Sequence, residues 1–271
     1  MNKHPLHHLL EHCRESKRIT LGVFVILRAL IIICMFRQLF QAHYQDVMLC
    51  ILSLFVMSIP ALLHTTLHLR MPNILEIAIA VFVFSAEILG EISNFYGQFA
   101  FWDTMLHTIN GFLAAAIGFS VIDLLNTHAK GIKLSPLFVA LVSFCFSMTV
   151  GVLWEFFEFG GDRLAHLDMQ KDRIVQSVSS VEFDPEHDNN AITIDGIAYT
   201  VLYDSNGNEL LIIEGGYLDI GIIDTMKDLL VNMAGAIVFS TFGYLYIHRR
   251  DKFGFAGNFL IVQENDPSQA D

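Results

Sequence analysis

Apolar residues along this chain gather into six long runs that are separated by polar connections. The runs cover approximately residues 19–40, 44–64, 74–92, 102–125, 137–159 and 222–247. Each run is long enough for a helix to cross the apolar part of a bilayer, which takes roughly 20 residues. The pattern predicts an all-α polytopic membrane protein built as a six-helix transmembrane bundle.

The connection between the fifth and sixth runs is the only polar segment of any size. From Ala191 onward, β-branched and aromatic residues alternate with turn residues: Asp195-Gly196 separates 191–194 from 197–203, and a second turn at 204–207 precedes 209–213. Asp-Gly and Asn-Gly in such a setting are strong hairpin signals. We therefore expect a small β-meander within this insert.

The runs divide the chain into five parts. They are a basic, His-rich tail at 1–18, transmembrane helices one to five at 19–159, an acidic insert at 160–221, transmembrane helix six at 222–247 and a second tail at 248–271. Within the insert, 168–178 is predicted to form a short helix. The first tail either binds a metal through its histidines or is a solvated amphipathic lead-in, and 263–271 is expected to be disordered. No cleavable signal is expected, because no small-residue cleavage site follows the first apolar run.

Composition supports the membrane class and narrows the partners. Apolar residues make up 54% of the chain, and the mean hydropathy is +0.50. The net charge of −12 is concentrated in the insert, where twelve acidic residues face three basic ones. This acidic balance argues against nucleic acid as a partner. The four cysteines lie outside the insert and are expected to be small apolar residues without a disulfide framework.

Lysine and arginine near the ends of the runs indicate the orientation in the membrane. They occur in the first tail, in the second and fourth connections and after the sixth run, whereas the third connection has none and the insert is strongly acidic. By the positive-inside rule, both termini are predicted to be cytoplasmic and the insert extracytoplasmic. An even number of spans is consistent with this result.

In this orientation, four consecutive helices carry polar side chains near the outer surface. They are Glu87 and Glu91 in the third helix, Asp103, His107 and Asn110 in the fourth, Glu155 and Glu158 in the fifth, and Asp224, Asp228 and Asn232 in the sixth. Spacings of three or four residues place each set on one helix face. We expect these faces to meet in a shared pocket just beneath the outer surface.

Some of these residues have simpler possible roles: carboxylates cap helices or reach headgroup water, and amides bond across helices. The residues concerned are Asp103, Asp224, Glu91, Glu158, Asn110 and Asn232. These roles suit Glu87, Glu155, His107 and Asp228 less well, because apolar sequence surrounds them and ionisable groups at depth usually face a partner or a cavity. Arg28, near the middle of the first span, is expected either to pair with an acid on another helix or to snorkel through a water defect, and pairing is favoured.

Several carboxylates close together cannot all stay ionised without a compensating cation. A divalent cation is therefore predicted, and the excess of oxygen ligands favours Mg²⁺ or Mn²⁺ over Zn²⁺. The predicted ligands are Asp103, His107, Glu155, Asp224 and Asp228; the predicted catalytic residues are His107, Glu155 and Glu158. Such a cation could polarise a phosphate or carbonyl oxygen and activate water, which points to a lipid-type substrate at the outer leaflet.

Two other functions fit the same pattern. Acidic and imidazole side chains in a bundle also line the pathways of proton- or cation-coupled transporters, although a cluster at one face is not the midplane arrangement expected of them. A non-catalytic structural protein would use the same polar stripes only to hold its helices together. Whether the chain is an enzyme, and its oligomeric state, stay open at this point.

The polar motifs resemble those of a known family. Trp102-Asp103-x3-His107-x2-Asn110-Gly111, Trp154-Glu155-x2-Glu158 and Asp219-x4-Asp224-x3-Asp228-x3-Asn232-x2-Gly235 are similar to the motifs of small bacterial YjdF-type inner-membrane proteins. The resemblance covers roughly 74–247 and implies a bacterial cytoplasmic (inner) membrane location, but no reaction. The Asp-x3-His helix opening also resembles VanZ-like proteins, which implies envelope glycan or lipid metabolism.

Overall fold

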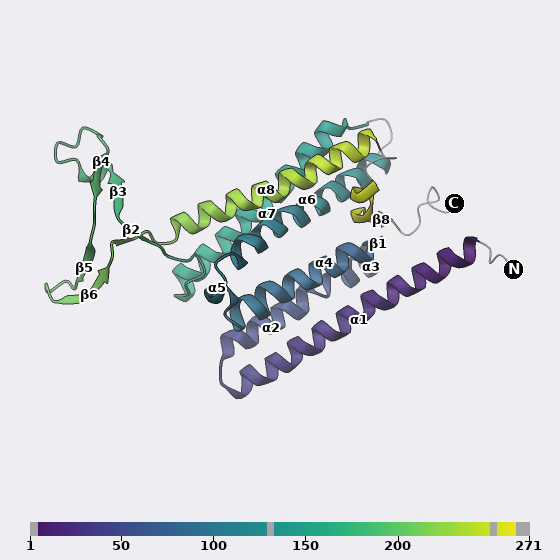
Figure 1. Ribbon diagram of the computed structural model, residues 1–271, viewed down its shortest axis with the longest axis horizontal. Helices are drawn as coiled ribbons and strands as arrows, with labels where there is room; N and C mark the ends of the chain where they lie inside the picture. The colour runs from purple at the N-terminus through teal and green to yellow at the C-terminus, as the bar shows by residue number, and fades with distance from the viewer. Residues whose placement is uncertain (1–4, 129–132, 250–253, 264–271) are drawn as a thin grey trace. The chain divides into compact units, whose positions relative to one another are not determined.

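The computed structural model describes residues 5–128, 133–249 and 254–263, and the chain forms two compact units (Figure 1). The first comprises Met1–Gly151 and Leu229–Asp271, and the second Val152–Asp228. Among the described residues, the helices long and apolar enough to cross a membrane are Lys17–Phe40, Tyr44–Thr66, Asn73–Ile92, Trp102–Asn126, Pro136–Leu164 and Ile222–His248. These match the six predicted runs, so the predicted class of fold is confirmed.

The first two spans form an antiparallel helical hairpin. Helix α1 (Pro5–Phe40) and helix α2 (Tyr44–Val56) lie side by side and are joined by residues 41–43 (Figure 1). Near this connection, Gln38 Nε2 donates a 2.8 Å hydrogen bond to Asp46 Oδ2. The predicted first tail is helical from Pro5, but the side chains of its histidines lie outside the described residues.

The second span is interrupted near its middle. Helix α2 ends at Val56 and α3 (Ile59–Leu67) begins after a two-residue turn, because Pro60 has no N–H to continue the helical bonding. Arg28 Nη2 donates a 2.9 Å hydrogen bond to the Met57 carbonyl at this turn, and the guanidinium lies 5.4 Å from the Phe24 ring centroid. The predicted pairing of Arg28 with an acid is therefore wrong: the arginine binds backbone at the break.

The third span changes its helical type. After a short strand β1 (Leu69–Arg70), α4 (Asn73–Val83) continues directly as the π-helix η1 (Phe84–Ile92), which carries Glu87 and Glu91. A short helix α5 (Phe95–Gln98) follows. The apolar pattern of 74–92 predicts one continuous span and does not distinguish its π-helical half.

Three long helices complete the set: α6 (Trp102–His128), α7 (Pro136–Ala165) and α8 (Ile222–His248). Within the first unit, α6 and α8 run parallel, because their ring contacts advance together along both helices. The ring centroids of Phe112 and Phe239 lie 5.0 Å apart, and those of Phe119 and Tyr246 lie 6.4 Å apart. The boundary between the two units falls inside α7 and α8, both of which are continuous helices.

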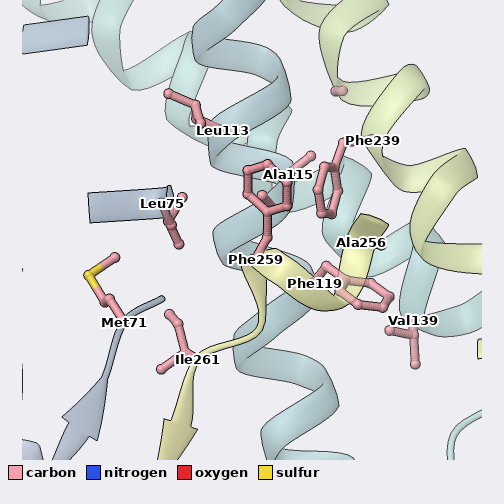
Figure 2. Close-up of a cluster of buried hydrophobic side chains, with 12 residues drawn as sticks. Met71, Leu75, Leu113, Ala115, Phe119, Val139, Phe239, Ala256, Phe259 and Ile261 are labelled. Carbon is pink, nitrogen blue, oxygen red and sulfur yellow. The ribbon is translucent and has the colours of Figure 1, made fainter. Parts of the chain in front are cut away.

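A cluster of buried apolar side chains forms the core of the first unit (Figure 2). It includes Phe119 of α6 and Phe239 of α8, but also Phe259 and Ile261 from beyond the last span. The 3₁₀ helix η3 (Gly254–Phe259) leads into strand β8 (Val262–Gln263), which pairs with β1. The predicted tail at 248–271 thus contains a core segment, while 264–271, predicted to be disordered, lies outside the described residues.

The insert contains small antiparallel sheets, as predicted, but their pairing is not a continuous meander. Three pairs form: β2 (Ile174–Val175) with β7 (Tyr217–Leu218), β3 (Ser177–Ser180) with β4 (Ile192–Asp195), and β5 (Tyr199–Tyr203) with β6 (Glu209–Glu214). A 3₁₀ turn η2 (Val181–Phe183) follows β3.

The hairpin around Asp204 is confirmed, since β5 and β6 pair with each other. The hairpin expected at Asp195-Gly196 is wrong, because β4 pairs with the upstream strand β3 instead of β5. The helix predicted at 168–178 is also wrong: β2 and β3 occupy its second half, where the β-branched Ile174, Val175 and Val178 suit a strand.

Candidate metal centre

Helix α6 begins at a fixed point because Trp102 is held on two sides. Its indole Nε1 donates a 3.3 Å hydrogen bond to the Ser85 carbonyl, and its ring packs edge-on against Phe95 with centroids 4.9 Å apart. Asp103 and His107 therefore occupy the first two turns of α6. His107 Nε2 lies 3.4 Å from Asp103 Oδ1, and the two side chains are 13% and 25% exposed, respectively.

One turn further, α6 meets α8 at backbone contact. A Cβ atom at Gly111 would lie 2.0 Å from the Asn232 carbonyl oxygen, and one at Gly235 would lie 2.0 Å from the Thr108 carbonyl oxygen. Only glycine allows this approach at either position. Asn110 Nδ2 donates a 3.0 Å hydrogen bond to Asn232 Oδ1, so the two predicted amides bond across the helices.

This contact determines where the preceding turn of α8 lies. Asp228 comes four residues before Asn232, and α8 is unbroken between them, so Asp228 is carried to the level of Asp103 and His107. The Asp228 side chain is buried, with 1% of the residue exposed. One ligand atom each from Asp103, His107 and Asp228 lie within 4.8 Å of one another. Three of the five predicted ligands thus come together.

The group consists of two carboxylates and one imidazole. Such a mixed oxygen and nitrogen set suits Mg²⁺, Mn²⁺ or Zn²⁺, and three protein ligands leave coordination positions for water or substrate. Lys227, which is not among the predicted site residues, has its Nζ 3.5 Å from Asp228 Oδ1. Its position directly beside Asp228 was visible in the sequence, and its ammonium supplies positive charge at the edge of the group.

Asp224, a predicted ligand, makes its described contacts elsewhere. Its Oδ2 accepts a 2.9 Å hydrogen bond from the Lys171 backbone N–H, and its Oδ1 lies 3.6 Å from Arg173 Nη2. Asp219 instead fills the capping role, because its Oδ2 accepts a 3.0 Å bond from the Ile223 N–H in the first turn of α8. These contacts tie the start of α8 to the insert, and Asp224 is not part of the three-residue group.

The two glutamates of α7 belong to the second unit and are both buried. Glu158 Oε1 accepts a 2.8 Å hydrogen bond from Trp154 Nε1, four residues earlier. Glu155 is 5% exposed and Glu158 is 9% exposed. Neither belongs to the group around His107. Their predicted catalytic roles, and that of Glu155 as a ligand, stay predictions.

The π-helical glutamates also lie outside the three-residue group. Glu87 lies in the first turn of η1. Glu91 follows one turn later in the same π-helix. Of the four helices expected to share a pocket, α6 and α8 supply the three-residue group, and the roles of the glutamates of η1 and α7 stay predictions.

Buried serines of α7, which the sequence analysis missed, hold this helix to α6. Ser147 Oγ donates a 2.8 Å hydrogen bond to the Gly111 carbonyl, and Ser143 Oγ donates a 2.7 Å bond to the Ala115 carbonyl. Their signal in the sequence is the four-residue spacing of Ser143, Ser147 and Gly151, which places three small residues on one face. Further along α6 than His107, these serine hydrogen bonds therefore hold α6 and α7 together.

Comparisons with known proteins agree with a membrane protein of unestablished activity. Residues 20–249 match the family model described as "Predicted membrane protein (DUF2238)". An uncharacterised protein of Thermotoga maritima is 29% identical over 97 residues, which span 36% of this chain and about half (48%) of that relative. No solved structure matches the chain.

The matched segment begins three residues into the first candidate span, Lys17–Phe40, and ends just after the last one, Ile222–His248. It therefore covers all six candidate spans almost completely. The YjdF-type resemblance is consistent with this family, whereas the VanZ-like resemblance stays a prediction. Because the family model covers most of the sequence, the chain belongs to the DUF2238 family of predicted membrane proteins.

Proposed function

We propose that this chain binds a divalent cation through Asp103, His107 and Asp228. The observation that carries the proposal is the closeness of the three ligand atoms, within 4.8 Å of one another. Two carboxylates with a neutral imidazole carry a charge of −2, of which the Lys227 ammonium beside Asp228 offsets one, and a bound cation would compensate the remaining negative charge where unpaired charge is costly. The oxygen excess favours Mg²⁺ or Mn²⁺, and the imidazole makes Zn²⁺ the third candidate.

The proposed location is the bacterial inner membrane, with both termini cytoplasmic. The distribution of lysine and arginine supports this orientation, which places the start of α6 and the insert on the outer side. The test is labelling of intact cells with a membrane-impermeant maleimide in a chain without its natural cysteines. Ser205→Cys in the insert should react and Lys133→Cys should not; the opposite result would overturn the orientation.

The proposed chemistry is hydrolysis or group transfer on an envelope lipid-type substrate. A cation with open positions would polarise a phosphate or carbonyl oxygen and lower the pKa of bound water. In hydrolysis, the water oxygen bonds to phosphorus or carbon, the bond to the leaving oxygen breaks, and the proton from water passes to that oxygen. His107, Glu155 and Glu158 are the proposed acid–base residues, and Glu155 and Asp224 the proposed additional ligands.

Cation binding is tested on the purified full chain by metal analysis and by calorimetric titration with Mg²⁺, Mn²⁺ and Zn²⁺. The wild-type chain should bind one cation, and His107→Ala and Asp228→Asn should each weaken binding by at least about tenfold. Asp123→Asn is the matched control, because Asp123 lies on α6 outside the group. Equal binding by all four proteins, or binding by none, would overturn the proposal.

The same proteins separate the two other functions. Cation flux into proteoliposomes that is lost in Asp228→Asn would indicate coupled transport instead of hydrolysis. Neither bound cation nor flux, in variants with unchanged thermal stability, would leave the structural function, in which contacts such as that between Asn110 and Asn232 only hold helices together.

A further inference from the structure

The α1–α2 hairpin has a fixed antiparallel register. Close to the connection, Gln38 contacts Asp46 at 2.8 Å. Farther into the hairpin, Arg28 contacts the Met57 carbonyl at 2.9 Å. The partners in each contact are nearly equidistant from the 41–43 connection, so residues at matched distances face each other throughout this stretch.

This register places two cysteines opposite each other. Cys34 lies one turn from Gln38, and Cys50 lies one turn from Asp46. In both helices the cysteine is on the side away from the 41–43 connection. Cys50 is fully buried within an apolar cluster, and Cys34 packs against that cluster. Both cysteines are free thiols.

The next turn shows that the helices pack closely here. Ile31 of α1 and Ser53 of α2 occupy the corresponding positions, and both have an exposure of 0%. A disulfide requires two Cα atoms within about 7 Å and side chains that point toward each other. The register of the hairpin and the close packing one turn away, at Ile31 and Ser53, support such an approach of Cys34 and Cys50. Cys145, another free thiol, lies on α7 and is exposed.

We propose that Cys34 and Cys50 form a redox-active thiol pair that closes to a disulfide between α1 and α2. The oxidant is a small-molecule or protein disulfide. One cysteine, as its thiolate, attacks a sulfur of this oxidant, forming a mixed disulfide and expelling one thiolate. The second cysteine then attacks the mixed disulfide, the Cys34–Cys50 bond forms, and the second oxidant thiol leaves. Two cysteine thiols are oxidised, and one disulfide is reduced to two thiols.

Cys34 and Cys50 each lie six residues from the neighbouring helix end, Phe40 and Tyr44 respectively, which is roughly 9 Å along the helix. Cys34 is partly exposed on the outer side of this packing, whereas Cys50 is covered. Cys34 is therefore the thiol that an oxidant reaches first, and Cys50 is the one that resolves the mixed disulfide. This order predicts that removal of Cys50 traps an adduct on Cys34.

The test uses the full chain in membranes with Cys13→Ser and Cys145→Ser, so that only the pair remains. The protein is treated with excess oxidised glutathione, denatured, and allowed to react with a polyethylene glycol maleimide. Before oxidation, two adducts are expected on a gel; after oxidation, none is expected, and reduction should restore both. With the further change Cys50→Ser, mass spectrometry should find glutathione on Cys34 and no internal disulfide.

A chain that also carries Ser205→Cys in the insert is treated in parallel, and a glutathione adduct on this exposed added cysteine confirms that oxidant reached the protein. If the pair keeps two reactive thiols while the added cysteine is modified, the proposal is overturned. A disulfide found only between two chains would also overturn it. The matched variant Cys34→Ser should retain one maleimide adduct after oxidation, because the remaining Cys50 has no partner.

Discussion

Polar side chains are buried by different routes in two of the helix pairs, α1–α2 and α6–α8. In the α1–α2 hairpin, polar groups meet across a three-residue connection: Gln38 binds Asp46, and Arg28 binds the Met57 carbonyl. In the α6–α8 pair, Asn110 and Asn232 meet across 122 positions of sequence. The hairpin register follows from a short connection, whereas the α6–α8 register depends on glycines that let backbones touch.

The two pairs differ in what aligns their buried polar groups with each other. A hairpin has little freedom to slide, so its polar partners can be found by counting outward from the connection. The α6–α8 pair has no such constraint, because α7 and the insert intervene. Its alignment depends on close packing at Gly111 and Gly235, as is common where membrane helices approach through small residues.

The largest expected effect comes from breaking the α6–α8 contact. Gly111→Ala places a Cβ atom 2.0 Å from the Asn232 carbonyl oxygen, so the helices must separate. We expect a loss of about 3 kcal/mol in stability, measured by unfolding in detergent, together with loss of cation binding. Gly22→Ala in α1 is the matched control, since nothing lies within 4 Å of its Cβ position. Similar stability for the two variants would contradict the contact.

Breaking the hairpin at its deep end should have the next largest effect. Arg28→Ala removes the donor to the Met57 carbonyl at the helix break and is expected to reduce stability by about 1–3 kcal/mol. Thermal unfolding in detergent measures the change. Arg37→Ala serves as the control, because Arg37 lies in the same helix with an exposed side chain. An equal effect of both variants would mean that charge, and not the carbonyl contact, is responsible.

A smaller effect is expected from the amide pair. Asn110→Ala and Asn232→Ala should each cost roughly 0.6–2 kcal/mol, the range found for hydrogen bonds between membrane helices. A double-mutant cycle on unfolding free energies measures their coupling. Strictly additive effects would show that the two amides do not stabilise the protein through each other.

The smallest effect on stability is expected from a contact within the insert, where both partners lie in a single turn. The Asn208 side chain and backbone N–H donate to the Asp204 carboxylate and lower the pKa of Asp204 below its ordinary value. The stabilisation from this lowered pKa is present above the unfolded pKa and is lost as pH falls through the folded one. Asn208→Ala should raise the pKa of Asp204, measured by carboxyl ¹³C NMR titration.

Asn190→Ala is the control for this titration, since Asn190 lies in a different turn of the insert, where its N–H binds Asp184. An unchanged pKa of Asp204 in Asn208→Ala would show that the backbone donors alone are responsible. An equal rise in both variants would point to a general loss of structure in the insert.

Local sequence signals predicted much of the fold. The six apolar runs identified all candidate spans, and the Asp204 turn identified the β5–β6 hairpin. The same reasoning failed at Asp195-Gly196, because β4 finds a partner upstream in β3 and a turn signal does not reveal competing strands. The π-helix at Phe84–Ile92 also has no local signature that a helical pattern could show.

The candidate site was predictable only in part. Asp103, His107 and Asp228 were found because similar polar residues open two apolar runs. Asp224 shares that pattern, yet its carboxylate contacts the Lys171 backbone N–H and Arg173. Spacing places residues on a helix face, but it does not tell which neighbour that face meets.

The segment after the last span has a consequence for how the chain acquires its structure. Ser120 Oγ in α6 donates a 2.9 Å hydrogen bond to the Phe259 carbonyl and accepts one from the Ile261 N–H. These partners leave the ribosome only after every membrane-crossing helix has been translated. The core around Ser120 can therefore be completed only after all six helices have been translated. A nascent chain that ends at Arg249 would lack these contacts and could not complete its tertiary structure.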